Sequence, residues 1–497
     1  MAKRTLIRNG LVIDGSGATG AKKDILIEND RIKSVGDAAT AAAGAPDTAE
    51  IDATGKIVCP GFIDMHAHSD FLLSVDGSMT AKLRQGFTTS VMGTCGFSGA
   101  PSSERMKKIF YKFAGGMFGK YCPFDWSSMG EYLERIRANK LGANVFSQVG
   151  YGNLRLMTMG AMPAKANAKQ IEEMKSLLAQ SLDEGARGFS TGLAYPTQSF
   201  SLPEEVVELC RVAAGRGALY STHVRNEMDK VEAAMKEALD AARKTGVSLQ
   251  ISHHKAVLKR NWGKVKRTLA MLEEAHAEGI DVETDAYPYN SFSNIFLPTL
   301  LLIFIQKEPD VDKQIIFLEL KKYPEFEGKT LRDFMAATKK SMGAAALELA
   351  RNEGATKIPI AGEMMSEDDV RYILSHPLTT IGSDGVEKRD GKPHPRLVAT
   401  SVRFLEKYAL KEKLLPIEGA IHKMTGKPAA KLKLKQRGLL TEGYFADVVV
   451  FDPEKLHDRS DYGNTNKHPV GFDAVFVNGE IAVRNDEQTA ARSGNVL

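Results

Sequence analysis

The amino-acid sequence predicts an α/β protein built on a (β/α)8 barrel, with a small β-sandwich made from both termini. Two observations favour this fold: strand-like runs alternate with amphipathic helices through the middle of the chain, and short strands of alternating polarity stand at both ends. In addition, about 90 residues separate the last two predicted barrel strands, far more than an ordinary loop, which predicts a subdomain inserted at about 290–355. We expect 1–58 and 433–497 to form the sandwich, and 59–432 to form the barrel with its insert.

The central alternation predicts eight strands and the helices between them. Each strand candidate is an apolar run of a few residues, and each helix candidate has apolar residues at helical spacing. The expected strands are 60–66, 87–93, 143–150, 186–190, 218–224, 247–253, 280–286 and 379–383. The expected helices include 167–184, 203–215, 229–244 and 264–278, with further helical patterns inside the insert at 310–322 and 329–353.

The two ends of the chain have a different character. Residues 4–14 and 24–36 alternate apolar and polar side chains and break at Gly or Asn-Asp turns, which is typical of short antiparallel strands. Residues 446–452 and 472–483 repeat this character near the C-terminus. We therefore expect both ends to meet in one β-domain.

Composition narrows the classes of function. The 66 basic and 62 acidic residues leave a formal charge of +4 without a long run of one sign, which argues against nucleic acid or an anionic membrane as the main partner. The sequence has no apolar run of 18 residues and no signal-peptide pattern at its start. Its four scattered cysteines lack a disulfide-like spacing and indicate a reducing, cytoplasmic location. The sequence leaves open whether the chain forms a homo-oligomer.

The stretch Ile57-Val-Cys-Pro-Gly-Phe-Ile-Asp-Met-His-Ala-His68 is the first that indicates chemistry. Side chains two apart in a strand project to the same side, so His66 and His68 can offer two imidazoles to one metal ion at the end of the first barrel strand. A His-x-His pair also arises by chance. Support comes from other strands, because barrel metal sites collect ligands from several strand ends at the C-terminal face.

Cys95, His223 and His253 are the other candidate ligands. Each lies at or just beyond the end of a predicted strand, and with the first two histidines they form a mixed nitrogen and sulfur set suited to zinc. Taken singly, Cys95 could equally be a buried small side chain or a nucleophile, and either histidine could be a hydrogen-bonded core residue. His254 points to the opposite side of the strand and is expected to pack.

Asp384 follows the last predicted strand in Thr380-Ile-Gly-Ser-Asp-Gly385. Between Ser and Gly it could be a turn residue, but at the barrel mouth a carboxylate beside a metal can take a proton from water. Lys255, Tyr287 and Arg396 could bind a carboxylate, or could each be a solvated surface residue. Together they favour an acidic small-molecule substrate.

These segments resemble the amidohydrolase superfamily and, within it, the N-acyl-D-amino-acid deacylases, or D-aminoacylases. The resemblance runs nearly end to end. Its motifs are Pro60-Gly-Phe-Ile-Asp-Met-His-Ala-His68, Gly93-Thr-Cys-Gly-Phe-Ser98, Ser190-Thr-Gly-Leu-Ala-Tyr-Pro196, Thr222-His-Val-Arg-Asn-Glu227, Ile251-Ser-His-His-Lys255, Asp285-Ala-Tyr-Pro-Tyr289, Gly382-Ser-Asp-Gly385, His394-Pro-Arg396 and the tail 437–453. Related cyclic amidases bridge two metals through a carboxylated lysine, whereas the comparable segment 188–192 has no lysine.

The resemblance implies zinc-dependent hydrolysis of N-acyl-D-amino acids to a carboxylate and a D-amino acid, an amidohydrolase reaction on linear amides. It implies that Cys95, His223 and His253 hold one tightly bound zinc ion and that His66 and His68 form a weaker second position. By the same resemblance, Asp384 is the base and then the acid. Lys255, Tyr287 and Arg396, with Tyr195 nearby, hold the substrate carboxylate.

Two segments depart from the family pattern, namely Asn290-Ser-Phe-Ser-Asn-Ile-Phe-Leu297 and the Leu-Val-Ala-Thr-Ser that follows Arg396. The side-chain preference therefore has to be judged from the residues themselves. Four apolar residues favour apolar substrates, and 288–300 contains no arginine that could pair with an acidic side chain; the four are Phe292, Ile295, Phe296 and Leu297. The alternatives are a cyclic amidase of the hydantoinase or dihydroorotase type, or a metal-free scaffold.

Overall fold

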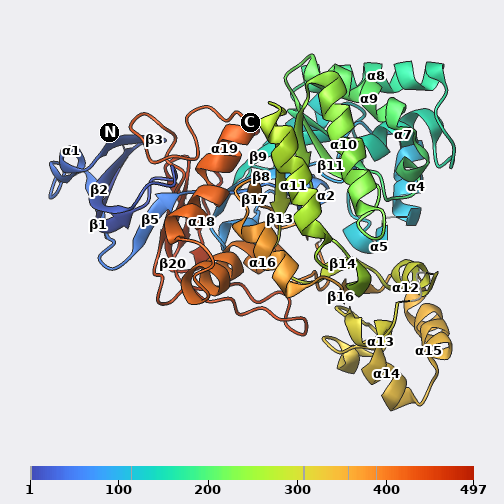
Figure 1. Ribbon diagram of the computed structural model, residues 1–497. Coiled ribbons are helices and arrows are strands. Elements are labelled where there is room, and N and C mark those ends of the chain that lie inside the picture. The colour runs from blue at the N-terminus through green and yellow to red at the C-terminus, as the bar shows by residue number, and fades with distance from the viewer. Residues whose placement is uncertain (1–2, 114, 306–307, 356, 388) are drawn as a thin grey trace.

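The computed structural model describes residues 3–113, 115–305, 308–355, 357–387 and 389–497. At its centre lie eight parallel strands whose order in the sheet follows their order in the chain (Figure 1), which confirms the predicted barrel. Each strand overlaps the run predicted for it. The strands are β6 (Phe62–Asp64), β8 (Phe87–Met92), β9 (Asn144–Gly150), β10 (Gly188–Gly192), β11 (Leu219–His223), β12 (Ser248–Ile251), β13 (Val282–Ala286) and β17 (Thr379–Ile381).

The first and last strands bring the barrel close to closure. The backbone amide of Met65 donates to the carbonyl oxygen of Ile381 at 3.2 Å. Just beyond this contact β7 (Ala67–His68) pairs in parallel with β18 (Gly385–Val386). The two ends of the barrel sheet therefore meet at the segments that carry the His-x-His pair and Asp384.

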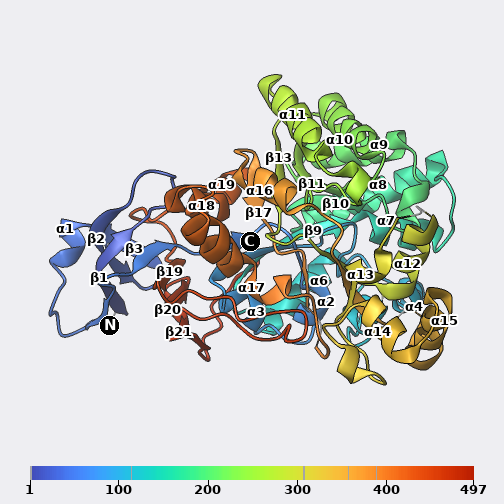
Figure 2. The ribbon, with the colours of Figure 1, turned by 60° about the horizontal axis from the view of Figure 1, so that its bottom comes forward.

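The helices on the outside of the barrel begin and end at residues suited to those positions. Asn167 caps α8 in a reciprocal pair with Gln170, Pro203 is the first residue of α9, and α10 ends at Gly246, whose φ is 70°. Figure 2 shows α8 to α11 side by side around the barrel. Their bounds match the predicted helices within two residues: α8 (Ala168–Asp183), α9 (Pro203–Ala214), α10 (Val231–Thr245) and α11 (Lys264–Ala277).

The remaining helices pack around the same core or lie beside the mouth. None of the helices in the described residues has the length and apolar character needed to cross a membrane. The helices are α1 (Asp37–Thr40), α2 (Asp70–Leu73), α3 (Thr80–Leu83), α4 (Glu104–Phe113), α5 (Gly115–Phe118), α6 (Met129–Ala138), α7 (Tyr151–Met159), α16 (Glu367–Ser375), α17 (Arg396–Arg403), α18 (Ile417–Met424) and α19 (Gly426–Lys431).

Strands from both termini share one mixed sheet of nine strands, as the alternating patterns at the two ends predicted. The seam is an antiparallel pair between β5 and β19, with Cys59 opposite Val449. Since β5 leads directly into β6, this sheet fixes where the barrel starts. Its strands are β1 (Arg4–Val12), β2 (Ala21–Glu28), β3 (Arg31–Val35), β4 (Thr48–Asp52), β5 (Ile57–Pro60), β19 (Val448–Phe451), β20 (Phe472–Val477), β21 (Glu480–Arg484) and β22 (Glu487–Gln488).

The segment between β13 and β17 forms a separate body at the lower right of Figure 1. Its antiparallel sheet has the order β14 (Phe292–Ile295), β16 (Pro359–Gly362), β15 (Ile315–Phe317). Because β16 belongs to this sheet, the insert reaches Gly362 and not only about 355. Its helices are α12 (Phe296–Ile305), α13 (Val311–Gln314), α14 (Leu331–Thr338) and α15 (Met342–Leu349).

The helix predicted at 310–322 is wrong beyond Gln314. Ile315, Ile316 and Phe317 are all buried and form strand β15. The partner of this strand, β16, lies far along the chain. A local periodicity cannot register such a partner, so tertiary pairing overrides the helical pattern.

Candidate active site

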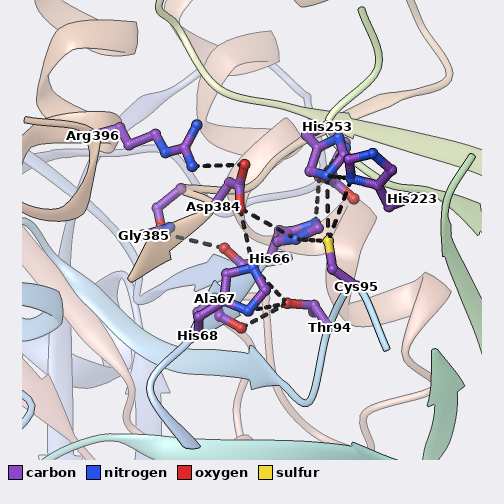
Figure 3. Close-up of polar contacts among 12 residues, drawn as sticks. His66, Ala67, His68, Thr94, Cys95, His223, His253, Asp384, Gly385 and Arg396 are labelled. Carbon is purple, nitrogen blue, oxygen red and sulfur yellow. Dashed lines mark hydrogen bonds and ion pairs between the residues drawn. The ribbon is translucent and has the colours of Figure 1, made fainter. Parts of the chain in front are cut away.

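The C-terminal ends of the barrel strands place the predicted metal ligands around one point. His223 is the last residue of β11, Cys95 follows β8 and His253 follows β12. His66 and His68 follow β6 at the start of the barrel. Figure 3 shows the five side chains converging, and all five are buried.

The distances among the donor atoms fit a metal ion. Cys95 Sγ lies 3.2 Å from His66 Nε2, 3.3 Å from His253 Nε2 and 4.0 Å from His223 Nδ1. Ligands of a tetrahedral zinc ion are separated by about 3.4 Å between two nitrogens and about 3.6 Å between nitrogen and sulfur. A buried thiol among imidazoles is also the donor chemistry that zinc prefers.

A second group of donors adjoins the first. Asp384 Oδ1 is 3.1 Å from His68 Nε2 and 3.6 Å from His66 Nε2. His66 Nε2 thus lies between Cys95 and Asp384 and faces both groups. The arrangement has room for one metal ion beside Cys95 and offers donors for another beside Asp384.

Three of these residues stand in the left-handed backbone region, where residues other than glycine are rare. The φ angles are 54° at Cys95, 36° at His253 and 47° at Asp384. This conformation costs roughly 1–2 kcal/mol per residue unless the surroundings hold it. Two backbone amides are held: that of Asp384 donates to His66 O at 2.7 Å, and that of His253 donates to the carboxylate of Asp285 at 2.8 Å.

Burial is the largest influence on the pKa values of Cys95, His223 and His253. It raises the pKa of the Cys95 thiol, an effect that His66 partly offsets. It lowers the pKa of His223 to about 4 and holds that of His253 well below its usual value, with Lys255 adding to the shift. The two imidazoles are therefore neutral and have a lone pair to offer, while the thiol has to release its proton when a metal binds.

Asp384 is ionised although it is buried. Burial alone would raise the pKa of its carboxyl group, but the Arg396 guanidinium and the nearby histidines hold it well below the usual value. Arg396 Nη2 donates to Asp384 Oδ2 at 2.9 Å. A charged carboxylate beside the metal-ligand cluster can accept a proton during a reaction.

The three predicted carboxylate binders also meet at this mouth. The Lys255 ammonium and the Arg396 guanidinium lie 5.6 Å and 4.5 Å from the centre of the Tyr287 ring. Among the described residues, the Tyr287 hydroxyl and two guanidinium nitrogens of Arg396 are buried without a hydrogen-bond partner. Unpaired buried donors are costly, and an anion bound at this cluster would satisfy them.

Tyr195 and His254 have different surroundings. The Tyr195 hydroxyl lies 3.3 Å from His223 Nδ1, at the edge of the ligand cluster. Burial raises the pKa of this phenol well above its usual value, so it remains a donor. His254 Nε2 instead lies 2.7 Å from the Thr268 hydroxyl on α11, which confirms that this histidine packs away from the mouth.

Two carboxylates of the site were not singled out from the sequence. Asp285, at the end of β13, lies 3.2 Å from His66 Nδ1. Glu227 lies within reach of His223, His253 and Lys255, and these three groups lower its pKa although burial would raise it. Both residues stand inside motifs that carry the family resemblance. Their place in these motifs was the one sequence feature that could have identified them as site residues.

The four apolar residues proposed for the substrate pocket do not act together. Phe292, Phe296 and Leu297 pack into the core of the insert, where Phe296 meets Phe317 at 5.5 Å between ring centres. Ile295 alone lines a small cavity beside Arg396. The other residues that line it are Met117, Ser293, Asn294, Leu318, Pro359, Val386, Lys392, Pro393 and His394.

Comparisons with known proteins place the chain in a family. The model of the Amidohydrolase family matches residues 49–341 and 335–483. An N-acyl-D-glutamate deacylase of Alcaligenes xylosoxydans xylosoxydans is 37% identical over 99% of this chain and 96% of its own length. A D-aminoacylase and an N-acyl-D-aspartate deacylase of the same organism are each 35% identical over 99% of this chain and cover 97% and 94% of their own lengths.

Solved structures agree with these relatives. A D-aminoacylase described as having a binuclear metal centre, with one-metal activation and second-metal attenuation, has a TM-score of 0.88 at 35% identity over 99% of both chains. The same values hold for an N-acyl-D-glutamate deacylase from Bordetella bronchiseptica, complexed with zinc and a phosphonate mimic of the tetrahedral intermediate. A dihydropyrimidinase from Brevibacillus agri NCHU1002, at 18% identity and a TM-score of 0.59, shares the fold alone.

The matched lengths, the barrel with its terminal sheet and the thiol among imidazoles at the barrel mouth lead to one conclusion. The chain belongs to the amidohydrolase family and, within it, to the D-aminoacylases, the deacylases of N-acyl-D-amino acids.

Proposed function

We propose that this protein hydrolyses the amide bond of N-acyl-D-amino acids with zinc held by Cys95, His223 and His253, and that it prefers apolar side chains. The observation that carries the proposal is the group of buried donors without acceptors on Tyr287 and Arg396, directly beside the ligand cluster. An α-carboxylate satisfies these donors. The zinc-containing relative from Bordetella bronchiseptica supports the choice of metal.

The chain's own residues provide binding and proton transfer. When bound, zinc supplies a Lewis acid that polarises the scissile carbonyl and lowers the pKa of water. Asp384 accepts a proton from the attacking water and returns it to the amide nitrogen, which turns that nitrogen into a leaving group. The Tyr195 hydroxyl, a donor at the edge of the cluster, stabilises negative charge that develops on the carbonyl oxygen.

Handedness follows from fixing two groups of the substrate and enclosing its side chain. Lys255, Tyr287 and Arg396 hold the α-carboxylate, and a zinc ion held by the ligand cluster would orient the acyl carbonyl. With both groups fixed, inversion at the α-carbon exchanges the positions of the side chain and the hydrogen. One enantiomer therefore fits the walls of the site and the other does not.

The preference for apolar side chains rests on the cavity beside Arg396. Met117, Ile295, Leu318 and Val386 give this cavity a largely aliphatic lining. The cation in the lining other than Arg396 is Lys392, and its ammonium group is already paired with Glu327. Apart from Arg396, which we assign to the α-carboxylate, the described lining residues include no unpaired lysine or arginine for an acidic substrate side chain.

The test is release of free amine from N-acetyl-D-methionine and N-acetyl-L-methionine by the zinc-loaded protein. We expect turnover of the D form alone, and we expect the Cys95→Ala variant to lose it. N-acetyl-D-glutamate and N-acetyl-D-aspartate in the same assay test the side-chain preference. Equal or faster turnover of these acidic substrates would reject the apolar preference and leave the reaction intact.

Cyclic amides test the competing reading. We call Lys255, Tyr287 and Arg396 the carboxylate clamp. A cyclic amidase would open dihydrouracil or hydantoin without needing this clamp. Ring opening without turnover of either methionine derivative would reject the deacylase proposal. A purified protein that binds no zinc at all would instead support the metal-free scaffold.

A further inference from the structure

We infer that Glu227 is a positioning residue that joins the metal-binding histidines to the carboxylate clamp through one carboxylate. The inference rests on the proposed function and adds to it a residue that touches neither the substrate nor the metal. Glu227 stands four residues after the end of β11, and its side chain is 14% exposed. From this position its carboxylate faces the ends of both β11 and β12.

The two oxygens of Glu227 reach three different groups. Oε1 lies 3.1 Å from His253 Nδ1 and 2.7 Å from Lys255 Nζ. Oε2 lies 3.6 Å from His223 Nε2. No other carboxylate in the described residues forms ion-pair or hydrogen-bond contacts with both of these histidines and with Lys255.

The histidine atoms facing Glu227 are the ones that metal binding leaves protonated. Toward Cys95 the rings present His253 Nε2 and His223 Nδ1. These nitrogens need a free lone pair to bind a metal, so the protons sit on His253 Nδ1 and His223 Nε2. Glu227 Oε1, at 3.1 Å, is placed to accept from His253 Nδ1 and to fix the tautomer and orientation of that ring. Glu227 Oε2, at 3.6 Å, favours the matching tautomer of His223 by electrostatic attraction.

Lys255 depends on the same carboxylate. Its Nζ lies 2.6 Å from His253 Nδ1. Once that nitrogen carries a proton, both atoms are donors and cannot bond to each other. Glu227 Oε1 is the acceptor that both can share, so the position of the ammonium group becomes tied to the tautomer that the metal requires.

A role of Glu227 as a metal ligand fits less well. His223, Glu227 and His253 do form a group that is compact enough to bind an ion. However, an ion there would need lone pairs on His253 Nδ1 and His223 Nε2, and these nitrogens carry the protons when the opposite nitrogens bind a metal beside Cys95. Glu227 therefore serves as a hydrogen-bond acceptor behind the ligands.

The experiment uses Glu227→Gln, which keeps the size of the side chain and removes its charge, with Glu237→Gln as the matched control. Glu237 is 18% exposed and pairs with Arg225, outside the site. Zinc affinity of the metal-free proteins is measured by competition with a chromophoric chelator. KM and kcat are measured at saturating zinc for N-acetyl-D-methionine and for its amide, which lacks the α-carboxylate.

We expect Glu227→Gln to bind zinc about 10- to 100-fold more weakly, the usual cost of losing a group behind a ligand. KM for the carboxylate substrate should rise about tenfold, while KM for the amide and kcat should change less than threefold. With Lys255→Met added, the double variant should raise KM by clearly less than the product of the two single effects, as residues in contact do. The control should match the wild type throughout.

Three results would overturn the inference: unchanged zinc affinity and KM, a change in only one of the two, or independent KM effects in the double variant. A wild type that binds no zinc or cleaves no substrate would instead reject the proposed function, so the two failures are distinguishable. If Glu227→Gln does not fold, Glu227→Asp takes its place. The shorter carboxylate cannot span the three groups, so the same paired loss is expected.

Discussion

The donors at the barrel mouth fall into two halves that are built in different ways. We call Cys95, His223 and His253 the central half, since they come from strands inside the barrel sheet, and His66, His68 and Asp384 the closing half, since they come from its two edges. All six are buried. Exposure to solvent therefore does not distinguish the halves. They differ in the neighbouring residues that hold their side chains in place.

The central half is supported by two carboxylates, one in the loop after β11 and one on β13. Glu227 lies behind the two histidines of this half, and Asp285 accepts a hydrogen bond from the backbone amide of His253. The closing half rests on a buried ion pair at the edge of the sheet. Lys82, on α3, is completely buried and donates to Asp64 at 2.8 Å and to the Ser383 hydroxyl at 2.9 Å.

The chemistry of the halves differs in the same way. The central half offers a thiol and two neutral imidazoles, which are good zinc ligands. In the closing half one oxygen of Asp384 is already bound by the Arg396 guanidinium, so the carboxylate has less to offer a metal. From this comparison we expect metal binding and proton transfer to be assigned to different parts of the barrel, and variants should separate them.

The largest expected effect is in the closing half. Asp384→Asn removes the proton acceptor, and kcat should fall about 1,000-fold, near 4 kcal/mol, within the usual range for general acid–base catalysis. Zinc bound to the central half should remain, as measured by metal analysis of the purified protein. If the variant lost its zinc, or kept its kcat, the division between the halves would be wrong.

The second largest effect is expected at the Lys82–Asp64 ion pair, which holds the closing half in place. Lys82→Met leaves the Asp64 carboxylate buried and unpaired, which costs about 3 kcal/mol. We expect a thermal midpoint lower by about 3 °C, measured by circular dichroism on zinc-loaded protein. Lys236→Met is the control, because its ion pair with Asp240 is on the surface and is worth about 0.5 kcal/mol or less. Equal midpoints for the two variants would contradict this account.

Breaking the central half should weaken metal binding directly. Cys95→Ala removes the one sulfur ligand of the described cluster, and zinc affinity should fall at least about 100-fold, near 2.7 kcal/mol, by comparison with losses behind a ligand. Competition with a chelator measures the loss. The His68→Ala variant provides the comparison, since its first zinc ion should bind as tightly as in the wild type.

A smaller effect concerns the carboxylate clamp that spans both halves. Replacing N-acetyl-D-methionine by its amide removes the partner of the unpaired donors on Tyr287 and Arg396, and KM should rise about 10-fold, near 1.4 kcal/mol. Arg396→Met should raise KM for the acid and change KM for the amide little. A similar KM for acid and amide in the wild type would show that the clamp does not bind this carboxylate.

The smallest effect is expected at the rim of the closing half. His68→Ala leaves Cys95, His223, His253 and Asp384 in place, so kcat/KM at low zinc should change less than about threefold, or 0.7 kcal/mol. At high zinc the variant should bind one ion less than the wild type. Metal stoichiometry by atomic spectroscopy measures this, and a loss of the tight ion would place His68 among its ligands.

Much of this architecture could be predicted from the sequence. The barrel strands are short apolar runs, and parallel strands present their C-terminal ends on one face, so the ligand candidates at those ends had to come together. The helix proposed at 310–322 failed because β15 pairs with a distant strand. Such pairing leaves no local pattern.

The residues that hold the site in place could not be predicted from the sequence, for physical reasons. Lys82 lies on a helix, where a lysine usually reaches solvent, and nothing local indicates that its ion pair with Asp64 is buried. Glu227 stands among polar loop residues and resembles any surface acid. The left-handed backbone at Cys95, His253 and Asp384 was not predicted, because even Asp and His, which adopt it more often than most residues, do so in only a minority of cases.

The pairing of β7 with β18 has a consequence for how the protein is made. His68 and Asp384 are separated by 316 residues, so on the ribosome the histidine emerges long before the aspartate. The central half is complete once residue 253 has been synthesised, whereas the closing half waits for the last barrel strand. Under the proposed function, a chain that ends before Asp384 would have all three residues of the central half but would lack the proton acceptor, and so would not hydrolyse the substrate.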